Sequence, residues 1–221
     1  MSGVLSRRHL VLGLMAGTAG CASTIRQSPY WGTIAAAIKG TGANPGVSRE
    51  HSDSLPYANI AAWFEGGAPV LLVLGGVEPD GTLNWYGADH KSISTSGPMV
   101  TRVIGFDVEL RDVRFGAGWS VDIRSMVGGK YERSMSYQAD RRVELLMKSE
   151  FKRGEAKDIA IFGRTYPVIE VEERVSSSGR YRFTNRYWVD PKSGFCRKSI
   201  QRVIPTEANL NIEVLKPFVP A

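Results

Sequence analysis

Acidic side chains are the residues of this chain that could support hydrolytic chemistry. Asp89, Glu170 and Glu172 are the candidates, because two carboxyl groups about 5 to 9.5 Å apart can hydrolyse a glycosidic bond. On a strand, Glu170 and Glu172 would share one face, since side chains alternate between faces. Glu173 follows them directly. We expect these glutamates to be solvated residues opposite the apolar residues of a strand.

Histidines and cysteines give weaker indications of catalysis. His51 and His90 are the only histidines after residue 20, and each lies in a polar or turn-like segment. Cys21 is the only cysteine besides Cys196, so we expect Cys196 to be a free, partly buried thiol. The sequence has no G-x-S-x-G elbow, H-E-x-x-H helix or P-loop. We therefore expect no catalytic residue, metal site or cofactor, and a protein that is not an enzyme.

Tryptophans suggest a second kind of chemistry, because aromatic rings stack on the faces of sugars. Trp85, Trp119 and Trp188 are the candidate residues for a binding groove. Trp85-Tyr86 and Tyr187-Trp188 are adjacent pairs, so on a strand each pair places one ring on each face of the sheet. One ring of each pair should belong to the core, because aromatic residues are enriched in strands and fill cores. The other ring would line a groove or cover the outer surface.

The first 20 residues have the composition of an export signal. Arg7 and Arg8 precede a short apolar run, and small residues follow up to Cys21. The segment Thr18-Ala19-Gly20-Cys21 resembles a bacterial lipobox, which is cut before a cysteine that becomes lipid-modified. The two arginines also resemble a twin-arginine export motif. We predict a cleaved lipoprotein signal peptide over residues 1–20 and lipidation of Cys21.

The residue after the cysteine predicts the destination. Ala22 stands there instead of aspartate, and by resemblance to proteobacterial lipoprotein sorting this favours the outer membrane. Several acyl chains such as palmitate hold a protein stably on a membrane. We therefore expect a lipid-anchored protein at the periplasmic face of the outer membrane. No stretch of sequence reaches the roughly 18 to 20 apolar residues that a spanning helix needs.

Composition and charge fit an ordinary globular domain. Of the 221 residues, 43% are hydrophobic and 23% are charged, which suits one sizeable domain or two small ones. The net charge is +6, from 28 basic and 22 acidic residues, and Arg7 and Arg8 supply two of the positive charges. Because the basic residues are spread along the chain, we expect no nucleic-acid partner.

Hydrophobic patterning predicts strands from residue 55 onward. Apolar or alternating runs of strand length lie at 70–74, 82–86, 119–124, 142–148, 180–189 and 209–214. Turn residues separate them, at 79–81, 128–129, 152–155, 176–179 and 190–194. We expect an all-β domain over 55–221, built as an antiparallel curved sheet that forms an open barrel or a sandwich. Residues 21–54 should be a tether with a short N-terminal helix at Trp31–Ile38.

Three segments resemble the YjbF/GfcB family of bacterial lipoproteins, which is associated with group 4 capsule and related exopolysaccharides. They are Pro69–Gly75 with Trp85–Asp89, Asn185–Phe195 and Glu213–Pro217. The resemblance implies an outer-membrane lipoprotein that acts as an accessory in polysaccharide production or export. It implies the membrane, polysaccharide and export-machinery proteins as partners. Of the family's features, only the lipidated cysteine is carried over to a residue here, Cys21.

Three functions remain open from the sequence. The first is a non-enzymatic, lipid-anchored accessory protein for capsule or exopolysaccharide production or export. The second is a carrier of acyl chains or lipids with an open-barrel cavity, similar to open-barrel lipoprotein chaperones. The third is a glycan-modifying enzyme that uses Asp89, Glu170 or Glu172. A roomy apolar cavity would favour the carrier, and two carboxyl groups facing one cleft would favour the enzyme.

Overall fold

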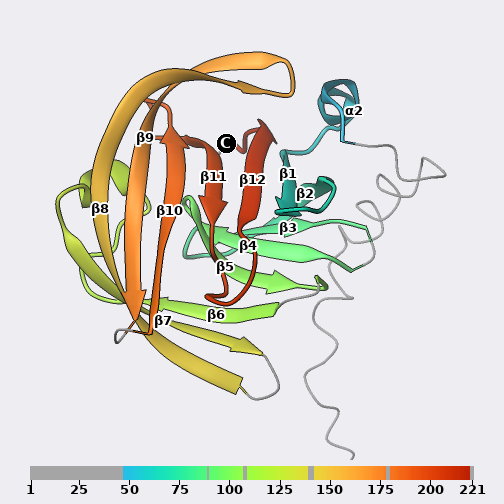
Figure 1. The fold of residues 1–221 in the computed structure, drawn as a ribbon. Coiled ribbons are helices and arrows are strands. Elements are labelled where there is room, and N and C mark those ends of the chain that lie inside the picture. The colour runs from blue at the N-terminus through green and yellow to red at the C-terminus, as the bar shows by residue number, and fades with distance from the viewer. Residues whose placement is uncertain (1–46, 89, 107–108, 139–141, 178–179, 220–221) are drawn as a thin grey trace, which may run out of the picture.

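The computed structural model describes residues 47–219, except 89, 107–108, 139–141 and 178–179. Within these residues the chain forms one short α-helix and twelve antiparallel strands (Figure 1). The helix is α2 (Arg49–Ser54), and the strands are β1 (Asn59–Phe64), β2 (Val70–Val77), β3 (Leu83–Tyr86), β4 (Ser92–Ser96), β5 (Met99–Ile104), β6 (Glu109–Phe115), β7 (Lys130–Gln138), β8 (Arg142–Ile161), β9 (Arg164–Ser177), β10 (Tyr181–Val189), β11 (Cys196–Gln201) and β12 (Leu210–Lys216). The signal segment with Arg7 and Arg8, the lipobox Cys21 and the helix predicted at Trp31–Ile38 lie outside the described residues.

The sheet closes into a barrel because its first and last strands pair. β1 lies between β2 and β12, so that Ile60 is opposite Leu72 on one side and Val214 on the other. Every other strand pairs with its neighbours in sequence, from β2 round to β12. The prediction of an all-β, antiparallel, curved sheet is confirmed. The sheet forms neither an open barrel nor a sandwich, because β1 and β12 pair and close it. Closure removes the unpaired strand edges that an open sheet exposes.

Alternating side chains fill the inside of the barrel. Ile60 of β1, Leu110 of β6 and Val175 of β9 belong to one buried cluster although their strands lie far apart in the sheet. Leu210 and Ile212 of β12 belong to the same cluster, as their period-two spacing predicts. The cluster therefore marks the interior, where strands from every side of the barrel meet.

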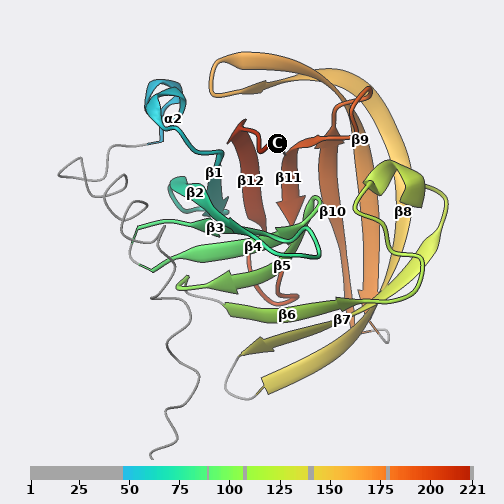
Figure 2. The same ribbon diagram turned by 180° about the vertical axis from the view of Figure 1, so that it is seen from behind.

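The predicted strand at 119–124 is wrong. These residues lie in the loop between β6 and β7, which ends in a short 3₁₀-helix, η1 (Ile123–Met126). Gly118 has a φ of +77°, a conformation that favours glycine and turns the chain. Asp122 then caps η1 by accepting a hydrogen bond from the Arg124 amide at 3.0 Å. The alternation does not correspond to burial here, because Ile123 is buried whereas Val121 is 60% exposed, more than the neighbouring Asp122. The loop bridges to β8 through Val127, and Figure 2 shows η1 beside that strand.

The two longest strands extend beyond the barrel as a hairpin (Figure 1). The turn predicted at 152–155 is wrong, because β8 continues through it with an irregular register between Arg153 and Ala156. Such a bulge bends a strand without ending its pairing. The far part of the hairpin, residues 154–170, lies over the outer face of β1 and β12 and is called the outer hairpin below. There Ile161 packs against Ala61 and Leu215.

Helix α2 fixes this outer layer in place. The Ser48 hydroxyl caps the helix by accepting a hydrogen bond from the amide of His51 at 3.1 Å. Arg49 donates hydrogen bonds to the carbonyl oxygens of Ile161 at 2.8 Å and Leu215 at 2.6 Å. One guanidinium group therefore joins α2, the outer hairpin and β12. Among the described residues, no helix has the length and apolar character needed to cross a membrane.

Candidate functional site

The barrel holds an apolar cavity of about 670 Å³. Its mouth is at the end of the barrel that carries the β2–β3, β4–β5 and β10–β11 turns, because residues of all three turns line it. Inside, the cavity lies between β3 and β4 on one side and β1, β11 and β12 on the other. Its main apolar lining residues are Ile60, Leu83, Trp85, Ile212, Val214 and Phe195.

Trp85 is the largest side chain in the cavity wall. It is 4% exposed, and its indole N–H donates a hydrogen bond to the Thr95 hydroxyl at 3.0 Å. The polar atom of the ring is therefore satisfied within the wall. Cys196 also lines the cavity, as a free and partly buried cysteine, which confirms that prediction. Burial of the thiol raises the pKa of Cys196 to about 12, so the group is neutral at physiological pH.

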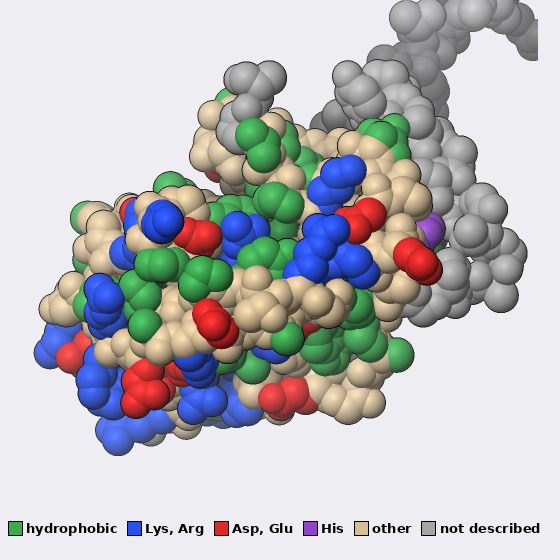
Figure 3. Space-filling view, turned by 90° about the horizontal axis from the view of Figure 1, so that it is seen from above, with side chains coloured by type: hydrophobic (Ala, Val, Ile, Leu, Met, Phe, Trp, Pro, Cys, Tyr) green, Lys and Arg blue, Asp and Glu red, His purple; other side chains and the backbone are tan. Residues whose placement is uncertain are grey.

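Apolar side chains also surround the mouth. Val77 is 48% exposed and Val121 is 60% exposed, and both line the cavity. Phe218 lines it from the segment after β12. Seen from above in Figure 3, hydrophobic side chains reach the surface between lysine and arginine side chains. The apolar character of the interior is thus continuous with the rim.

Beside the cavity, a row of polar residues crosses the interior. This polar belt consists of Arg133, Ser149, Glu173, Asn185, Tyr187 and Gln201, from five consecutive strands. Arg133 forms an ion pair with Glu173, and both side chains are almost completely buried. The Glu173 carboxylate also accepts hydrogen bonds from Ser149 at 2.6 Å, Asn185 at 2.8 Å and Tyr187 at 2.9 Å. The buried charge is therefore fully partnered.

The belt sets the protonation of its own members. Burial alone would raise the pKa of Glu173, but the charge of Arg133 and the surrounding hydrogen bonds outweigh burial and hold that pKa below its usual value. Burial and the neighbouring Glu173 charge raise the pKa of Tyr187 well above its usual value. Glu173 is therefore ionised and Tyr187 neutral over the physiological range. This pattern is that of a structural network with fixed charges.

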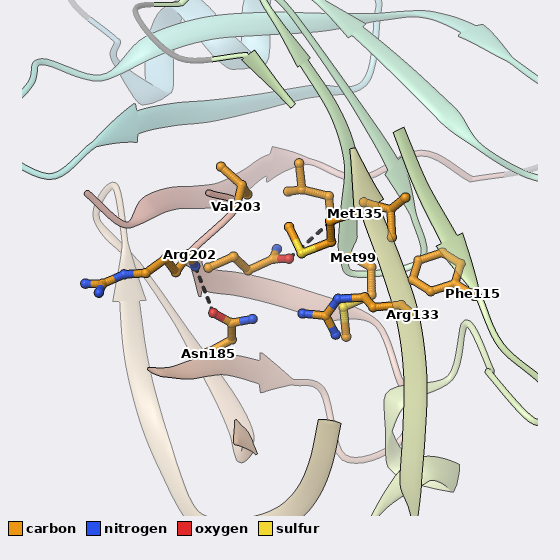
Figure 4. Close-up of a pocket in the computed structure, with 10 residues that line it drawn as sticks. Met99, Phe115, Arg133, Met135, Asn185, Arg202 and Val203 are labelled. Atoms are coloured by element: carbon orange, nitrogen blue, oxygen red, sulfur yellow. Dashed lines mark hydrogen bonds between the residues drawn. The ribbon is translucent and has the colours of Figure 1, made fainter. Parts of the chain in front are cut away.

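The belt also borders a small void, shown in Figure 4. Arg133, Asn185 and Gln201 line it together with Met99 and Met135. The Gln201 side chain accepts a hydrogen bond from the backbone N–H of Val100 at 3.1 Å. The void has a volume of about 10 Å³, which is at the lower limit for one water molecule and too small for a ligand.

The acidic residues singled out in the sequence lie elsewhere. Glu170 and Glu172 share the outer face of β9, as predicted. Glu170 is 15% exposed in its side chain, less solvated than expected, and forms ion pairs with Lys157 at 2.5 Å and Arg186 at 3.5 Å. Arg186 also lies 3.8 Å from Glu172. Both carboxylates are thus engaged with basic side chains on the outside of the barrel. Asp89 lies outside the described residues.

The structure does not bring the three candidate tryptophans into one groove. Trp85 lines the cavity. Trp119 stacks on Phe115, with 4.3 Å between ring centroids, in an aromatic group under the β6–β7 loop. Trp188 lies on the outer face, where it donates a hydrogen bond to Glu170 at 3.2 Å. Tyr187 points inward, so the adjacent pair divides between the two faces as predicted.

The histidines are separated from these features. His51 lies in α2 rather than in the polar loop that its neighbourhood suggested. His90 has a φ of +60° in an exposed turn before β4. Among the described residues, no group of three histidine, cysteine or acidic side chains is arranged to hold a metal ion.

The sequence does not predict the polar belt directly. The expectation that Glu173 is solvated is wrong, because its spacing from the inward-facing Val171 and Val175 places it on the inner face of β9, where its side chain is completely buried. That alternation was the available signal. Arg133 carries the same signal on β7, since Met135 and Tyr137 point into the core.

Comparison with known proteins gives concordant results. Residues 31–215 match the family described as "Group 4 capsule polysaccharide lipoprotein gfcB, YjbF". The "Uncharacterized lipoprotein YjbF" of Escherichia coli (strain K12) is 28% identical over 162 residues, which cover 71% of this chain and 75% of that protein. The crystal structure of the hypothetical lipoprotein YmcC from Escherichia coli (K12) has the same fold, with a TM-score of 0.70 and 21% identity over 79% of this chain and 91% of that one. Because the family match spans most of the sequence, the chain belongs to the YjbF family of group 4 capsule polysaccharide lipoproteins.

Proposed function

We propose that this protein is a non-enzymatic accessory factor in the production or export of a capsule or exopolysaccharide. The match of residues 31–215 to a family of capsule polysaccharide lipoproteins is the observation on which the proposal rests. The polysaccharide and proteins of the export machinery are its proposed partners. The closed barrel would act as a rigid body that presents binding surfaces to them.

The proposal includes a lipid anchor. The lipobox-like segment that ends at Cys21 supports cleavage after Gly20 and acylation of the cysteine. Ala22 supports sorting to the outer membrane, with the barrel on the periplasmic side. Residues 22–46 would then connect the anchor to Val47, the first described residue.

Ion pairing of the candidate carboxylates supports a role without catalysis. A glycosidase needs one carboxyl group that holds a proton and a second one that faces the same bond. Glu170 and Glu172 instead contact Lys157 and Arg186 on the outer face. Glu173 is buried within the polar belt, with four partners on its two oxygens. Glu170 and Glu172 thus lie on the opposite face of β9 from Glu173, and these three carboxylates provide no acid and nucleophile that face one cleft.

Deletion of the gene and complementation would test the proposal. Under conditions that induce the polysaccharide, the deletion strain should carry less of it at the cell surface, and the wild-type gene should restore it. A Glu170→Gln/Glu172→Gln gene should restore it as well, because the proposal assigns these carboxylates no chemistry. A Cys21→Ser gene should fail to restore it and should not incorporate labelled palmitate.

Each arm has a contrary result. Unchanged surface polysaccharide in the deletion strain would remove the accessory role. Failure of the Glu170→Gln/Glu172→Gln gene, with normal protein levels, would return the glycan-modifying enzyme to consideration. Full restoration by Cys21→Ser would show that the anchor is dispensable.

A further inference from the structure

We propose that the barrel cavity binds the aliphatic chain of a separate amphiphile, whose uncharged, hydroxyl-rich head group stays at the mouth. The inference stands on the cavity and does not require the polysaccharide role. It concerns one ligand chemistry, a straight hydrocarbon chain joined to a polar, non-ionic head.

The size and lining of the cavity support a hydrocarbon ligand. Its volume of about 670 Å³ lies within the range of roughly 300 to 1,000 Å³ over which proteins hold small molecules. Ile60, Leu83 and Ile212 supply aliphatic walls, and Trp85 supplies a ring whose only polar atom is already hydrogen-bonded to Thr95. A ligand in the deep part of the cavity therefore meets hydrocarbon surface, which favours an apolar chain.

The cavity is a local feature of the interior. The neighbouring part is filled by a second buried cluster, in which Ile123 and Met126 of η1 pack against Phe151 and Val171. The interior next to η1 is thus tightly packed, whereas the interior next to β3, β4 and β12 contains the cavity. Native interiors are close-packed, so an unfilled apolar space of this size with a solvent-facing mouth points to a ligand.

The polar groups at the mouth limit the head group. Asp80 and Asp122 both line the cavity. Asp80 accepts a hydrogen bond from the amide of Thr82 at 2.9 Å, which lowers its pKa. Asp122 is paired with Arg124 at 2.8 Å, and hydrogen bonds from Arg124 lower its pKa too. Lys198 also lines the cavity, but it is paired with Glu213 at 2.6 Å, and the charge of Asp122 is compensated by Arg124. Both carboxylates can accept hydrogen bonds from hydroxyl groups, and Asp80 is the charged lining residue whose charge is not compensated by one of these pairs, which disfavours an anionic head group.

The rim gives the chain a route of entry. Val77 and Val121 are exposed at the mouth, and Val219 is 76% exposed next to Phe218. Exposed apolar side chains around a cavity lower the cost of moving a hydrocarbon chain from a membrane or micelle into the interior. The mouth is therefore apolar enough to take up the chain and polar enough to hold the head.

Alkyl maltosides below their micellar concentrations are suitable probes, because they join a straight chain to an uncharged sugar head. We expect dodecyl maltoside to bind one molecule per chain in native mass spectrometry. Calorimetry with octyl, decyl and dodecyl maltoside should show affinity that rises about three- to fourfold for each added CH₂ group. Equal affinity for all three chain lengths would overturn the proposal, since it would place the binding on the sugar alone.

Trp85 reports where the chain lies. Dodecyl maltoside with a dibrominated chain should quench the fluorescence of the wild-type protein, because bromine quenches nearby indole rings. Trp85→Phe should lose most of this quenching when it is measured at a ligand concentration that calorimetry shows to saturate the variant. Trp119→Phe is the matched control and should leave the quenching unchanged. Undiminished quenching in Trp85→Phe would place the ligand elsewhere and overturn the proposal.

Filling the cavity should abolish binding. Val214→Trp adds a ring to the lining, and we expect at least about tenfold weaker binding of dodecyl maltoside. Leu146→Trp adds the same ring to an exposed position of β8 and should bind as the wild type does. Because Val214→Trp could impair folding, Leu83→Gln gives a second measurement: it places an amide on the half-buried apolar wall that meets the chain, and it should also weaken binding at least about tenfold. Wild-type affinity in a folded Val214→Trp or in Leu83→Gln would overturn the proposal.

The source of the chain is resolved by comparing two forms of the protein. Binding of dodecyl maltoside to both the lipidated protein and the Cys21→Ser variant supports a separate amphiphile. Binding to Cys21→Ser alone would show that the acyl chain of Cys21 itself occupies the cavity, which would overturn the proposal as stated. Since none of these measurements involves polysaccharide, their results are independent of the deletion experiment.

Discussion

Arg133 of β7 and Glu173 of β9 form an ion pair inside the barrel although β8 lies between their strands. Ser149 of β8 fills the gap and bonds to both partners, accepting from Arg133 at 2.7 Å and donating to Glu173 at 2.6 Å. Three neighbouring strands are therefore held in one register by a single buried contact. Removing one partner of such a contact leaves an unpaired charge in an apolar interior.

Replacing Glu173 with glutamine should lower the free energy of unfolding by about 3–5 kcal/mol, because Arg133 would then be buried without a counter-charge. Glu172→Gln is the matched control on the same strand. Its side chain is 28% exposed and its contact with Arg186 is long, so a change below about 1 kcal/mol is expected. Urea unfolding followed by circular dichroism would measure both. Equal effects of the two variants would show that the buried pair does not determine stability.

Replacing both buried partners should be less harmful than replacing one. In Arg133→Met/Glu173→Leu the interior holds no unpaired charge, so most of the stability lost in Glu173→Gln should return. The comparison uses the same urea titration. A double variant less stable than Glu173→Gln would mean that the polar belt stabilises the fold through its hydrogen bonds more than through charge compensation.

Acid should destabilise the wild type more than Glu173→Gln. The Arg133 charge and hydrogen bonds, against the opposing effect of burial, lower the pKa of Glu173 below its ordinary 4.5 in the folded state. The resulting stabilisation is complete above the unfolded-state pKa and is lost as the pH falls through the lower, folded-state pKa. Stability of the wild type should therefore fall from about pH 5 downward. Glu173→Gln should show a shallower dependence, and parallel pH profiles would contradict the assignment.

Removing the Arg49 side chain should loosen the outer hairpin without opening the barrel. Arg49→Ala deletes charged hydrogen bonds to three backbone carbonyl groups, and we expect a loss of about 1.5–3 kcal/mol. Hydrogen–deuterium exchange should rise over 158–166 and stay low in β5 and β6. Arg164→Ala is the control, because its partner Asp53 is exposed and little change is expected. Uniformly faster exchange across all strands would show that Arg49 supports the whole barrel.

Cys196 should react slowly with thiol reagents in the folded protein. Burial raises the pKa of its thiol from 9.0 to about 12, so the reactive thiolate is on the order of a thousandfold scarcer than at an unperturbed cysteine. In a Cys21→Ser variant Cys196 is the only cysteine, and Ellman's reagent then reports on it alone. The reaction should be slow in buffer and fast in concentrated urea. Equally fast reaction in both would place the thiol at the surface.

The strands could largely be predicted, because they depend on local alternation. Leu210 and Ile212 are inward in the structure as their spacing indicates, and Trp85-Tyr86 divides between the faces. The segment at 119–124 alternates just as regularly, yet it forms a loop and η1. Local alternation alone does not identify a strand, because the chain turns at Gly118 and leaves Val121 exposed although apolar and polar residues alternate.

Closure of the barrel and the cavity could not be predicted. Both depend on which distant strands meet, since β1 pairs with β12 across nearly the whole domain. The cavity lining comes from segments as far apart as Ile60 and Val214. The bend of the outer hairpin over β12 is also non-local, since it packs Ile161 against Leu215. On the outer face, Glu213 is buried and paired with Lys198 at 2.6 Å.

The pairing of β1 with β12 also determines when the barrel can close during folding. Asn59 and Lys216 are register partners, so the last contact of the cylinder needs both extremes of the domain in one place. During synthesis from the N-terminus, β1 can pair with β2 early, but its backbone groups on the other side stay unpaired until β12 has been made. Because every other strand pairs with its sequence neighbour, this closing contact carries the largest loop-closure cost in the sheet. The finished barrel can therefore form only after the final strand has been synthesised and has reached β1.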